Sequence, residues 1–284
     1  MEMTLIEQRD QFSKRNPEQT QVLNGREWGV IKASNSGPAL LLIPGTLGRA
    51  DIFWQQIDKL SNRAQVLSVS YPDTHDIAEW ADDLALMLDR YEIKSATVLG
   101  SSLGGYLAQF FAATYPERTD GLIAANTLSS VAGLTEKPPY SADIANTPIE
   151  VLREGFLAGI KARAHEAPEY QALTEMLVSE VEGRIPANHL KARLRALKHA
   201  PQIPEITLSA EKIVVIESED DPLIVKPVRA KVRKTLSPSV TYRFKHGGHF
   251  PYVVRPDAYL SIMEECLGLE ITGEDWGKGE VREI

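Results

Sequence analysis

Short runs of apolar residues alternate with longer amphipathic stretches along most of the chain. Each run is almost wholly apolar and is bounded by Gly, Pro or polar residues, which is typical of strands buried on both faces of a sheet. The stretches between the runs repeat apolar residues at helical spacing, so the pattern predicts a mostly parallel sheet with helices on both faces. The turn signal Asn24-Gly25 makes the first two strands an expected hairpin. The expected strands are 19–23, 28–33, 39–43, 65–69, 96–99, 121–125, 212–216 and 240–245, and the helices between them are 51–60, 77–91, 103–115, 226–236 and 256–267.

The alternation stops near Ser129 and resumes near Lys212. The residues between carry no strand pattern and predict helices, among them 168–182 and 187–198, after a first helix that begins at Ile149. A helical insert between consecutive strands of one sheet is the layout of a lid over a substrate pocket. A small helical domain without a gating role fits the same pattern.

The pattern of strands and helices predicts a domain organisation. Residues 1–128 and 206–270 form the α/β core, residues 129–205 form the helical lid, and residues 271–284 form a polar C-terminal tail. Because they are polar, we expect the first and last ~15 residues to be loosely held.

Charge and cysteine content narrow the classes of partner. The chain has 284 residues, with 31 Lys and Arg against 39 Asp and Glu, and so a formal net charge of −8. This balance argues against nucleic acid or an anionic membrane as the partner, because phosphate binding needs clustered Lys and Arg. Cys266 is the only cysteine, so no disulfide is expected.

The sequence also carries no targeting signal. Its N-terminal residues lack the apolar stretch of a signal peptide. No apolar run approaches the ~20 residues that a membrane-spanning helix needs. We therefore expect a globular protein of the cytoplasm, whose oligomeric state the sequence does not indicate.

The segment Gly100-Ser101-Ser102-Leu103-Gly104 fits the G-x-S-x-G pattern of a nucleophile elbow. It lies directly between an expected strand and an expected helix, where a tight turn projects the central side chain above the edge of the sheet. The outer glycines lack side chains, as a close approach of strand and helix requires. Ser102 is therefore the candidate nucleophile, and the alternative is a glycine-rich turn without reactivity.

A serine nucleophile needs a base, and the base needs an acid that orients it. His249 lies in the loop Lys245-His246-Gly247-Gly248-His249-Phe250-Pro251, after the last expected strand. The base belongs there when the triad runs serine, acid, histidine along the chain. We choose His249 and interpret His246 as a loop residue. The other histidines are His75, which could line the mouth of the site, and His165, His189 and His199, which we expect on the surface of the lid.

The acid should follow the strand that precedes this loop. The segment Glu217-Ser218-Glu219-Asp220-Asp221 places several carboxylates at the carboxyl end of strand 212–216, where open α/β sheets carry their sites. Asp221 is the candidate acid, since it directly precedes Pro222-Leu223-Ile224, which leads into a helix. Asp220 stays open as the alternative.

An acyl-transfer enzyme also needs N–H donors for the oxyanion that develops in the transition state. The backbone N–H of Leu103, directly after the candidate nucleophile, is the first expected donor. The second is expected in the loop Pro44-Gly45-Thr46-Leu47-Gly48, which follows an early strand, and there we choose Thr46. The alternative interpretation of that loop is an ordinary glycine-rich turn.

With three separate motifs in the same order, the chain resembles the α/β-hydrolase superfamily from Gln19 to Leu267, and within it the maspardin-like proteins. The resemblance implies an eight-stranded, mostly parallel sheet, a helical cap and a triad of Ser102, His249 and Asp221 or Asp220. Many members have His-Gly where this chain has Pro-Gly, and maspardin-like proteins can lack the triad histidine and act as binding partners. This chain has that histidine. The segments that carry the closer resemblance are Ala50-Asp51-Ile52-Phe53-Trp54, Gly100-Ser101-Ser102-Leu103-Gly104-Gly105-Tyr106-Leu107-Ala108-Gln109 and Gly247-Gly248-His249-Phe250-Pro251-Tyr252.

Together these observations predict an esterase-like serine hydrolase that cleaves an ester or other acyl bond of a small molecule through a Ser-His-Asp triad and an acyl-enzyme. Such an enzyme needs no metal ion and no organic cofactor. Other serine-dependent chemistry on this scaffold, such as hydrolysis of a C–C bond, stays open. The competing hypothesis is a non-catalytic adaptor or small-molecule receptor on a hydrolase scaffold, for which the resemblance to maspardin suggests a protein partner.

Overall fold

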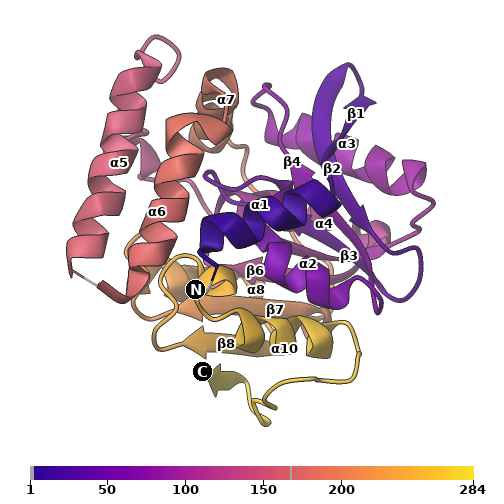
Figure 1. Ribbon diagram of the computed structural model, residues 1–284. Helices are drawn as coiled ribbons and strands as arrows, with labels where there is room; N and C mark the ends of the chain where they lie inside the picture. The colour runs from indigo at the N-terminus through magenta and orange to yellow at the C-terminus, as the bar shows by residue number, and fades with distance from the viewer. Residues whose placement is uncertain (1–2, 167) are drawn as a thin grey trace.

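Nine strands form one sheet in the computed structural model of the chain (Figure 1), which describes residues 3–166 and 168–284 except for the side chains of 164–166 and 168. The order in the sheet is β1-β2-β4-β3-β5-β6-β7-β8-β9. Strand β2 pairs antiparallel with β1 and β4, and all other pairs are parallel, so the mostly parallel sheet predicted from the sequence is confirmed. The strands are β1 (Gln19–Leu23), β2 (Arg26–Ala33), β3 (Ala39–Ile43), β4 (Gln65–Ser70), β5 (Ala96–Ser101), β6 (Thr119–Ala125), β7 (Ile213–Ser218), β8 (Val240–Phe244) and β9 (Val281–Glu283).

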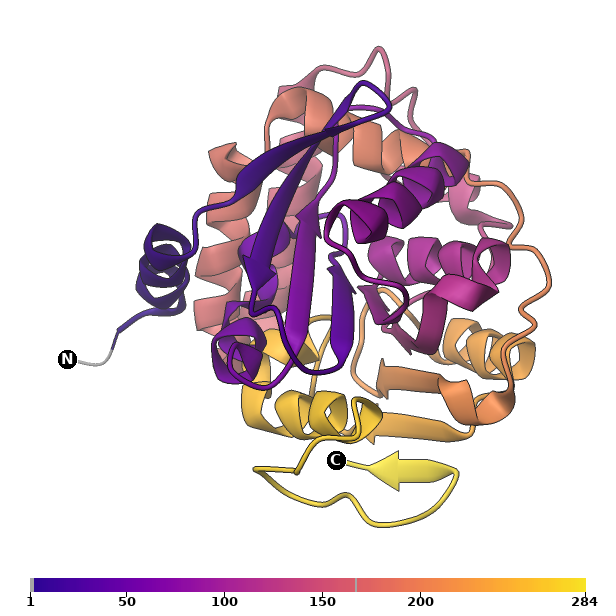
Figure 2. The same cartoon turned by 90° about the vertical axis from the view of Figure 1, so that its right-hand side faces the viewer.

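Helices cover both faces of the sheet (Figure 2). Side chains of the sheet alternate between two apolar clusters, one on each face. Along β3, Leu40 and Leu42 pack into the cluster that includes α2 and α10, whereas Leu41 and Ile43 pack into the cluster that includes α3, α4 and α8. This alternation follows from the two-residue repeat of a strand, and the runs are continuously apolar because helices cover both faces. The core helices are α2 (Trp54–Leu60), α3 (Ile77–Arg90), α4 (Leu103–Thr114), α8 (Lys226–Leu236), α9 (Pro251–Val254) and α10 (Pro256–Cys266).

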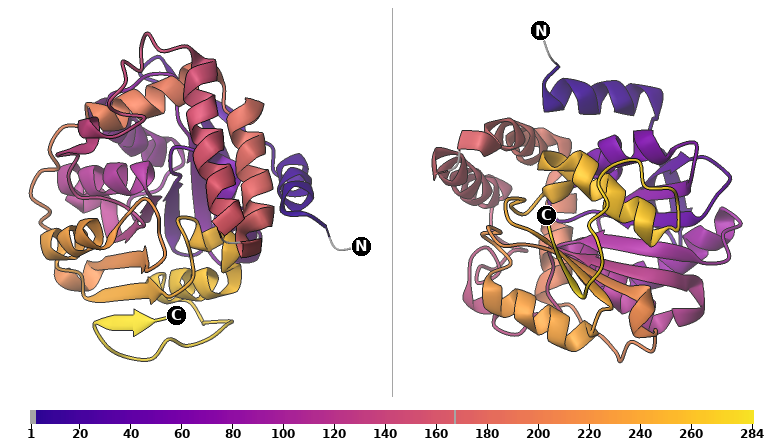
Figure 3. Two further views of the ribbon diagram at one scale, coloured as in Figure 1. Left: turned by 90° about the vertical axis from the view of Figure 1, so that its left-hand side faces the viewer. Right: turned by 90° about the horizontal axis from the view of Figure 1, so that it is seen from below.

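The chain between β6 and β7 forms a group of helices that we call the cap. Helices α5 and α6 run side by side, and the N-terminal helix α1 lies against α6 (Figure 3). The helical insert predicted at this point of the sheet is thereby confirmed. Within the described residues, no helix is both long and apolar enough to cross a membrane. The cap consists of α5 (Ile149–Glu166), α6 (Gln171–Ser179), a π-helical turn η5 (Glu180–Arg184) and α7 (Ala187–Lys198).

Both ends of the chain are more regular than the sequence predicts. The first residues form α1 (Leu5–Arg15), which starts with a capping box: Thr4 accepts the N–H of Glu7, whose carboxylate accepts the N–H of Thr4. At the other end, β9 adds a ninth strand parallel to β8, and Arg282 pairs with Glu265 at 2.6 Å. The expectation of loosely held ends was wrong because a few apolar residues in these polar segments, such as Phe12 and Trp276, pack against the core while hydrogen bonds and ion pairs fix the rest.

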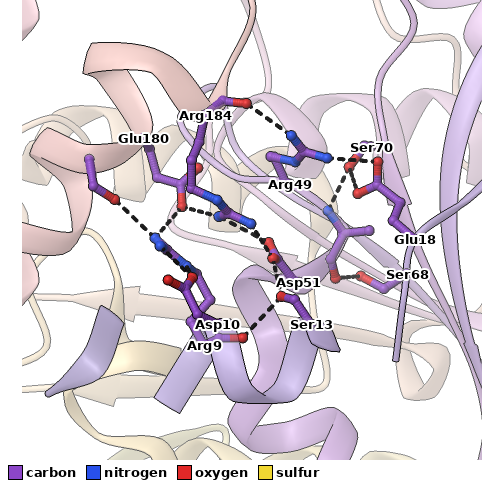
Figure 4. A network of polar contacts seen from close by, with 12 residues as sticks. Arg9, Asp10, Ser13, Glu18, Arg49, Asp51, Ser68, Ser70, Glu180 and Arg184 are labelled. Carbon is purple, nitrogen blue, oxygen red and sulfur yellow. Dashed lines mark hydrogen bonds and ion pairs between the residues drawn. The ribbon is translucent and has the colours of Figure 1, made fainter. Parts of the chain in front are cut away.

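Ion pairs fasten the cap to α1 and to the core (Figure 4). Glu180 in η5 is fully buried and accepts from Arg9 of α1 at 2.7 Å. Arg184, one turn further along, pairs with the same carboxylate and with Asp51 of the core. Ser13 of α1 donates to Asp51 at 2.6 Å. The α6–α7 half of the cap is therefore held in place by ion pairs in which Arg9, Glu180 and Asp51 are buried and Arg184 is partly exposed.

Asp83 of α3 fixes the β1–β2 hairpin to the core. It is fully buried, and its carboxylate accepts from Asn24, from the Trp28 indole N–H at 2.9 Å, and twice from the Arg26 guanidinium at 2.6 and 2.8 Å. These donors come from the hairpin turn and the strand after it, so one carboxylate satisfies polar groups that would otherwise be buried without partners.

We therefore expect Asp83→Ala to lower the free energy of unfolding by about 3–5 kcal/mol, because it strands a half-buried guanidinium and an indole N–H. The neighbouring Asp82 is exposed and contacts only the Tyr115 hydroxyl among the described residues, so Asp82→Ala is expected to cost less than about 1 kcal/mol. Urea unfolding followed by circular dichroism measures both. Equal losses in the two variants would show that the Asp83 cluster does not stabilise the fold.

Candidate active site

Ser102 occupies a strained turn between β5 and α4. Its φ of 55° and ψ of −118° lie in a region that residues with a side chain rarely adopt, and such strain is concentrated at functional sites. A Cβ on Gly100 would lie 2.0 Å from the carbonyl oxygen of Gly104, and a Cβ on Gly104 would lie 2.1 Å from that of Ile43. Only glycine fits at both positions, so the G-x-S-x-G spacing is what allows this strand and helix to meet at Ser102.

Four adjacent strands bring the candidate residues to one edge of the sheet. Strands β5, β6, β7 and β8 are parallel neighbours, so their carboxyl ends lie together, and Ser102, Asn126, Asp221 and His249 each follow one of these ends. Backbone hydrogen bonds continue beyond the strands: the N–H of Ser102 donates to the last residue of β6 at 3.0 Å, and that of Asn126 to β7 at 2.8 Å. Residues far apart in the sequence thereby meet at one rim.

His249 and Asp221 form a buried pair at this rim. The His249 Nδ1 lies 2.9 Å from the Asp221 Oδ2, and both side chains are at most 6% exposed. The other carboxylate oxygen accepts the backbone N–H groups of Leu223 and Ile224 at 2.8 and 3.0 Å. Burial alone would raise the pKa of Asp221, but the adjacent imidazole and the hydrogen bonds from His249, Asn126 and Ile224 hold this pKa below its ordinary value. Asp221 is therefore an ionised acceptor at neutral pH.

Asp220, the alternative acid, faces a different set of partners. Its Oδ1 accepts the N–H groups of Gly247 and Gly248 at 3.0 and 2.8 Å, and its Oδ2 accepts the Tyr170 hydroxyl of the cap at 2.5 Å. Asp220 therefore fixes the backbone of the loop that carries His249, whereas Asp221 contacts the imidazole itself. Of these two adjacent aspartates, one therefore contacts the histidine side chain and the other contacts the backbone of its loop.

Asn126 is a site residue that the sequence reasoning missed. It has a positive φ of 41°, is buried, and its Nδ2 lies 2.9 Å from the Asp221 Oδ2 and 3.2 Å from the Gly248 carbonyl oxygen. It therefore ties the carboxylate to the histidine loop. The signal that could have found it is its place directly after β6, at the same edge of the sheet as Ser102 and Asp221.

The loop after β3 lies against Ser102. A Cβ on Gly45 would be 3.1 Å from the Cβ of Ser102, so the glycine there permits direct contact between loop and elbow. The loop is closed by a hydrogen bond from the Gly48 N–H to the Gly45 carbonyl at 3.0 Å. Neither the N–H of Leu103 nor that of Thr46 has a hydrogen-bond acceptor within the described part of the chain. Unpaired N–H groups beside a nucleophile are the feature that an oxyanion hole requires.

The remaining histidines lie away from this pair. His246 and His199 are exposed, and His189 contacts the Tyr71 carbonyl through its Nδ1 at 3.0 Å. Burial, Arg195 and His199 lower the pKa of His75. The side chain of His165 is outside the described residues. Within the residues that the structure describes, no hydrogen bond joins the Ser102 hydroxyl to His249, a contact that in hydrolases often tightens only when substrate binds.

Comparison with known proteins agrees with the fold and the motifs. The family model for the alpha/beta hydrolase fold matches residues 38–256. Maspardin from Danio rerio is 23% identical over 219 residues, covering 76% of this chain and 70% of maspardin. Two solved structures have TM-scores of 0.74. A hydrolase from Pseudomonas aeruginosa PA01 has 19% sequence identity, and the match covers 89% of this chain and 98% of that one. The enol-lactonase from Burkholderia xenovorans LB400 has 15% sequence identity, and the match covers 88% of this chain and 100% of that one.

The match to the family model spans more than half of the chain and contains the strand that leads to the elbow, the cap, and the loops of Asp221 and His249. The resemblance to maspardin indicated by the sequence motifs is likewise confirmed. The chain belongs to the α/β-hydrolase family.

Proposed function

We propose that this hydrolase is a serine hydrolase that cleaves an ester or other acyl bond of a small molecule. The observation that carries the proposal is the buried His249–Asp221 pair at the rim where the strained Ser102 stands. Asp221 can only accept, so the imidazole Nδ1 carries the proton of this pair, and Nε2 is left as the base. This is the tautomer that accepts a proton from a serine hydroxyl.

The proposed reaction uses the chain's own groups throughout. His249 takes the proton of Ser102 as its oxygen attacks the carbonyl carbon, and the N–H groups of Leu103 and Thr46 bind the oxyanion. His249 then gives the proton to the leaving group, which departs and leaves an acyl-enzyme. Water, deprotonated by the same imidazole, then attacks the acyl carbonyl carbon; the bond to the Ser102 oxygen breaks, that oxygen takes the proton back from His249, and the acid product leaves. Asp221 stabilises the imidazolium at each transfer and does not itself take the proton.

The comparisons support an acyl bond as the substrate feature. The enol-lactonase from Burkholderia xenovorans shares the fold over 88% of this chain, and a lactone is a cyclic ester. Maspardin is 23% identical to this chain over 76% of its length. Neither names the substrate of this protein, so the proposal extends to the class of bond and the role of each residue.

Covalent labelling tests the proposal directly. We expect a fluorophosphonate probe to label the folded protein on Ser102, as located by mass spectrometry of the digested adduct, because only a base-activated serine reacts with it. p-Nitrophenyl acetate should release nitrophenolate in a burst that matches the concentration of labelled protein. Protein unfolded in urea is the control and should not react. Absence of label and burst in the folded protein would favour an adaptor or receptor instead.

A further inference from the structure

Arg193 is a buried cation that the proposed mechanism does not use. It lies on α7 of the cap and is 1% exposed, and its Nη1 donates to the carbonyl oxygens of Thr46 and Gly48 at 2.9 and 2.7 Å. Its guanidinium carbon lies 5.2 Å from the centre of the Tyr71 ring. Tyr71 in turn donates its hydroxyl to the Pro44 carbonyl at 2.6 Å. Arg193 and Tyr71 therefore hold carbonyl groups of the same short loop, residues 44–48.

Burial of the Arg193 charge at this position lowers the stability of the fold unless other contacts compensate for it. Within the described residues the hydrogen bonds of Arg193 go to carbonyl oxygens and not to a carboxylate, and burial lowers its pKa to about 10. A buried charge without a paired countercharge destabilises a fold unless its hydrogen bonds compensate for the lost water. The compensation comes from loop carbonyls and an aromatic face, so the cation and the loop fix each other's positions.

The same loop is also held by the cap at its far end (Figure 4). Arg184 of η5 pairs with Asp51, and Arg49 donates to the Arg184 carbonyl at 2.9 Å while pairing with Glu18 at 3.0 Å. The segment from Thr46 to Asp51 is thus fixed by two arginines of the cap. The α6–α7 half of the cap and this loop can move only together.

A hydrogen bond inside the turn sets the direction of the Thr46 N–H, and Arg193 fixes the position of the turn that contains it. The Gly45 carbonyl accepts from the Gly48 N–H inside the turn, and the Thr46 and Gly48 carbonyls are held by Arg193. In a trans peptide the N–H points opposite to the carbonyl of the preceding residue, so fixing the Gly45 carbonyl directs the Thr46 N–H out of the turn. Gly45 is the residue that lies against Ser102.

We propose that Arg193 is a positioning residue: from the cap, it holds the loop so that the Thr46 N–H meets the oxyanion, without itself touching the substrate. This inference rests on the proposed serine hydrolase function. It makes the α6–α7 half of the cap a structural part of the oxyanion hole. The oxyanion develops only in the transition state, so the loss of a well-placed donor falls on the transition state and leaves substrate binding largely intact.

The test compares Arg193→Met and Arg193→Lys with Arg195→Met, a variant on the same helix whose side chain has no hydrogen bond to the loop. With p-nitrophenyl acetate we expect Arg193→Met to lose on the order of 10²-fold in kcat, the effect of moving a catalytic donor by about 1 Å, with KM changed less than about threefold. Arg193→Lys, which keeps the charge and a donor, should lose less, and Arg195→Met should match the wild type.

A boronic acid inhibitor separates positioning from general loss of structure. Benzeneboronic acid forms a tetrahedral adduct with the serine, so its inhibition constant should rise by the same factor as kcat/KM falls, with far-ultraviolet circular dichroism unchanged. If Arg193→Met does not fold, Arg193→Gln, which removes the charge and shortens the side chain, carries the same comparison. Wild-type kcat and boronate affinity in a folded Arg193→Met, or in Arg193→Gln where that is the one tested, would overturn the inference. A wild type that fails to react with the fluorophosphonate probe would instead remove the proposed function on which it rests.

Discussion

Ser102→Ala is expected to lower kcat for p-nitrophenyl acetate by about 10⁴–10⁶-fold, the largest effect of any single substitution in this chain. The hydroxyl is the only group of the proposed mechanism that forms a bond to the substrate. Without it neither the acyl-enzyme nor the nitrophenolate burst can form. The residual rate should be that of water attack assisted by the oxyanion donors, so KM should change far less than kcat.

The neighbouring Ser101 provides a matched control for this measurement. It is buried, whereas Ser102 is half-buried, and it lies in the same elbow but has no part in the proposed chemistry. Ser101→Ala should keep kcat within about tenfold of the wild type, since the loss is limited to small changes in packing. Ser102→Ala should melt within a few degrees of the wild type, because Ala removes one oxygen and keeps a Cβ at the same strained φ. Equal turnover by Ser102→Ala and the wild type would show that the activity arises elsewhere.

The elbow could be predicted from the sequence because its determinants are local. Gly100, Ser102 and Gly104 stand within five consecutive residues, and the steric conflict that excludes a Cβ involves the strand and helix on either side of them. The mostly parallel sheet with helices on both faces was predictable for a similar reason. Continuous apolar runs separated by helices admit few arrangements other than a parallel sheet with helices on both faces.

The sequence favoured Asp221 as the acid but left Asp220 open, because the choice depends on contacts with a loop far along the chain. Asp221 contacts the imidazole of His249, whereas Asp220 accepts the backbone N–H of Gly247. Residue type and spacing are the same for both. Only the direction in which each side chain leaves the turn separates them, and that direction is set by packing.

The contributions of Asn126 and Arg193 were missed for a related reason. Asparagine and arginine are common surface residues, and neither stands in a motif. Asn126 became identifiable only once β6 was seen to lie between β5 and β7, and Arg193 only once α7 was seen to lie over the loop after β3. Polar residues whose role is to hold other catalytic groups have no local signature, although their burial in the fold distinguishes them.

Asp221→Asn is expected to lower kcat by about 10⁴-fold, whereas Asp220→Asn should lower it by about tenfold or less. An amide at position 221 can present its N–H₂ to the imidazole, which favours the tautomer with the proton on Nε2 and leaves no base for Ser102. At position 220 the amide oxygen can still accept the N–H groups of Gly247 and Gly248, so the loop keeps its conformation.

The two variants should be assayed side by side, with thermal unfolding of each to separate loss of chemistry from loss of fold. The difference should lie in kcat, since neither carboxylate binds the substrate in the proposed mechanism. A larger loss in the Asp220 variant, at equal stability, would show that Asp220 and not Asp221 is the acid. Equal small losses would mean that the imidazole needs no orienting carboxylate. The contact at 2.9 Å between Asp221 and the His249 Nδ1 leads us to expect neither, because it makes that carboxylate the one that selects the tautomer.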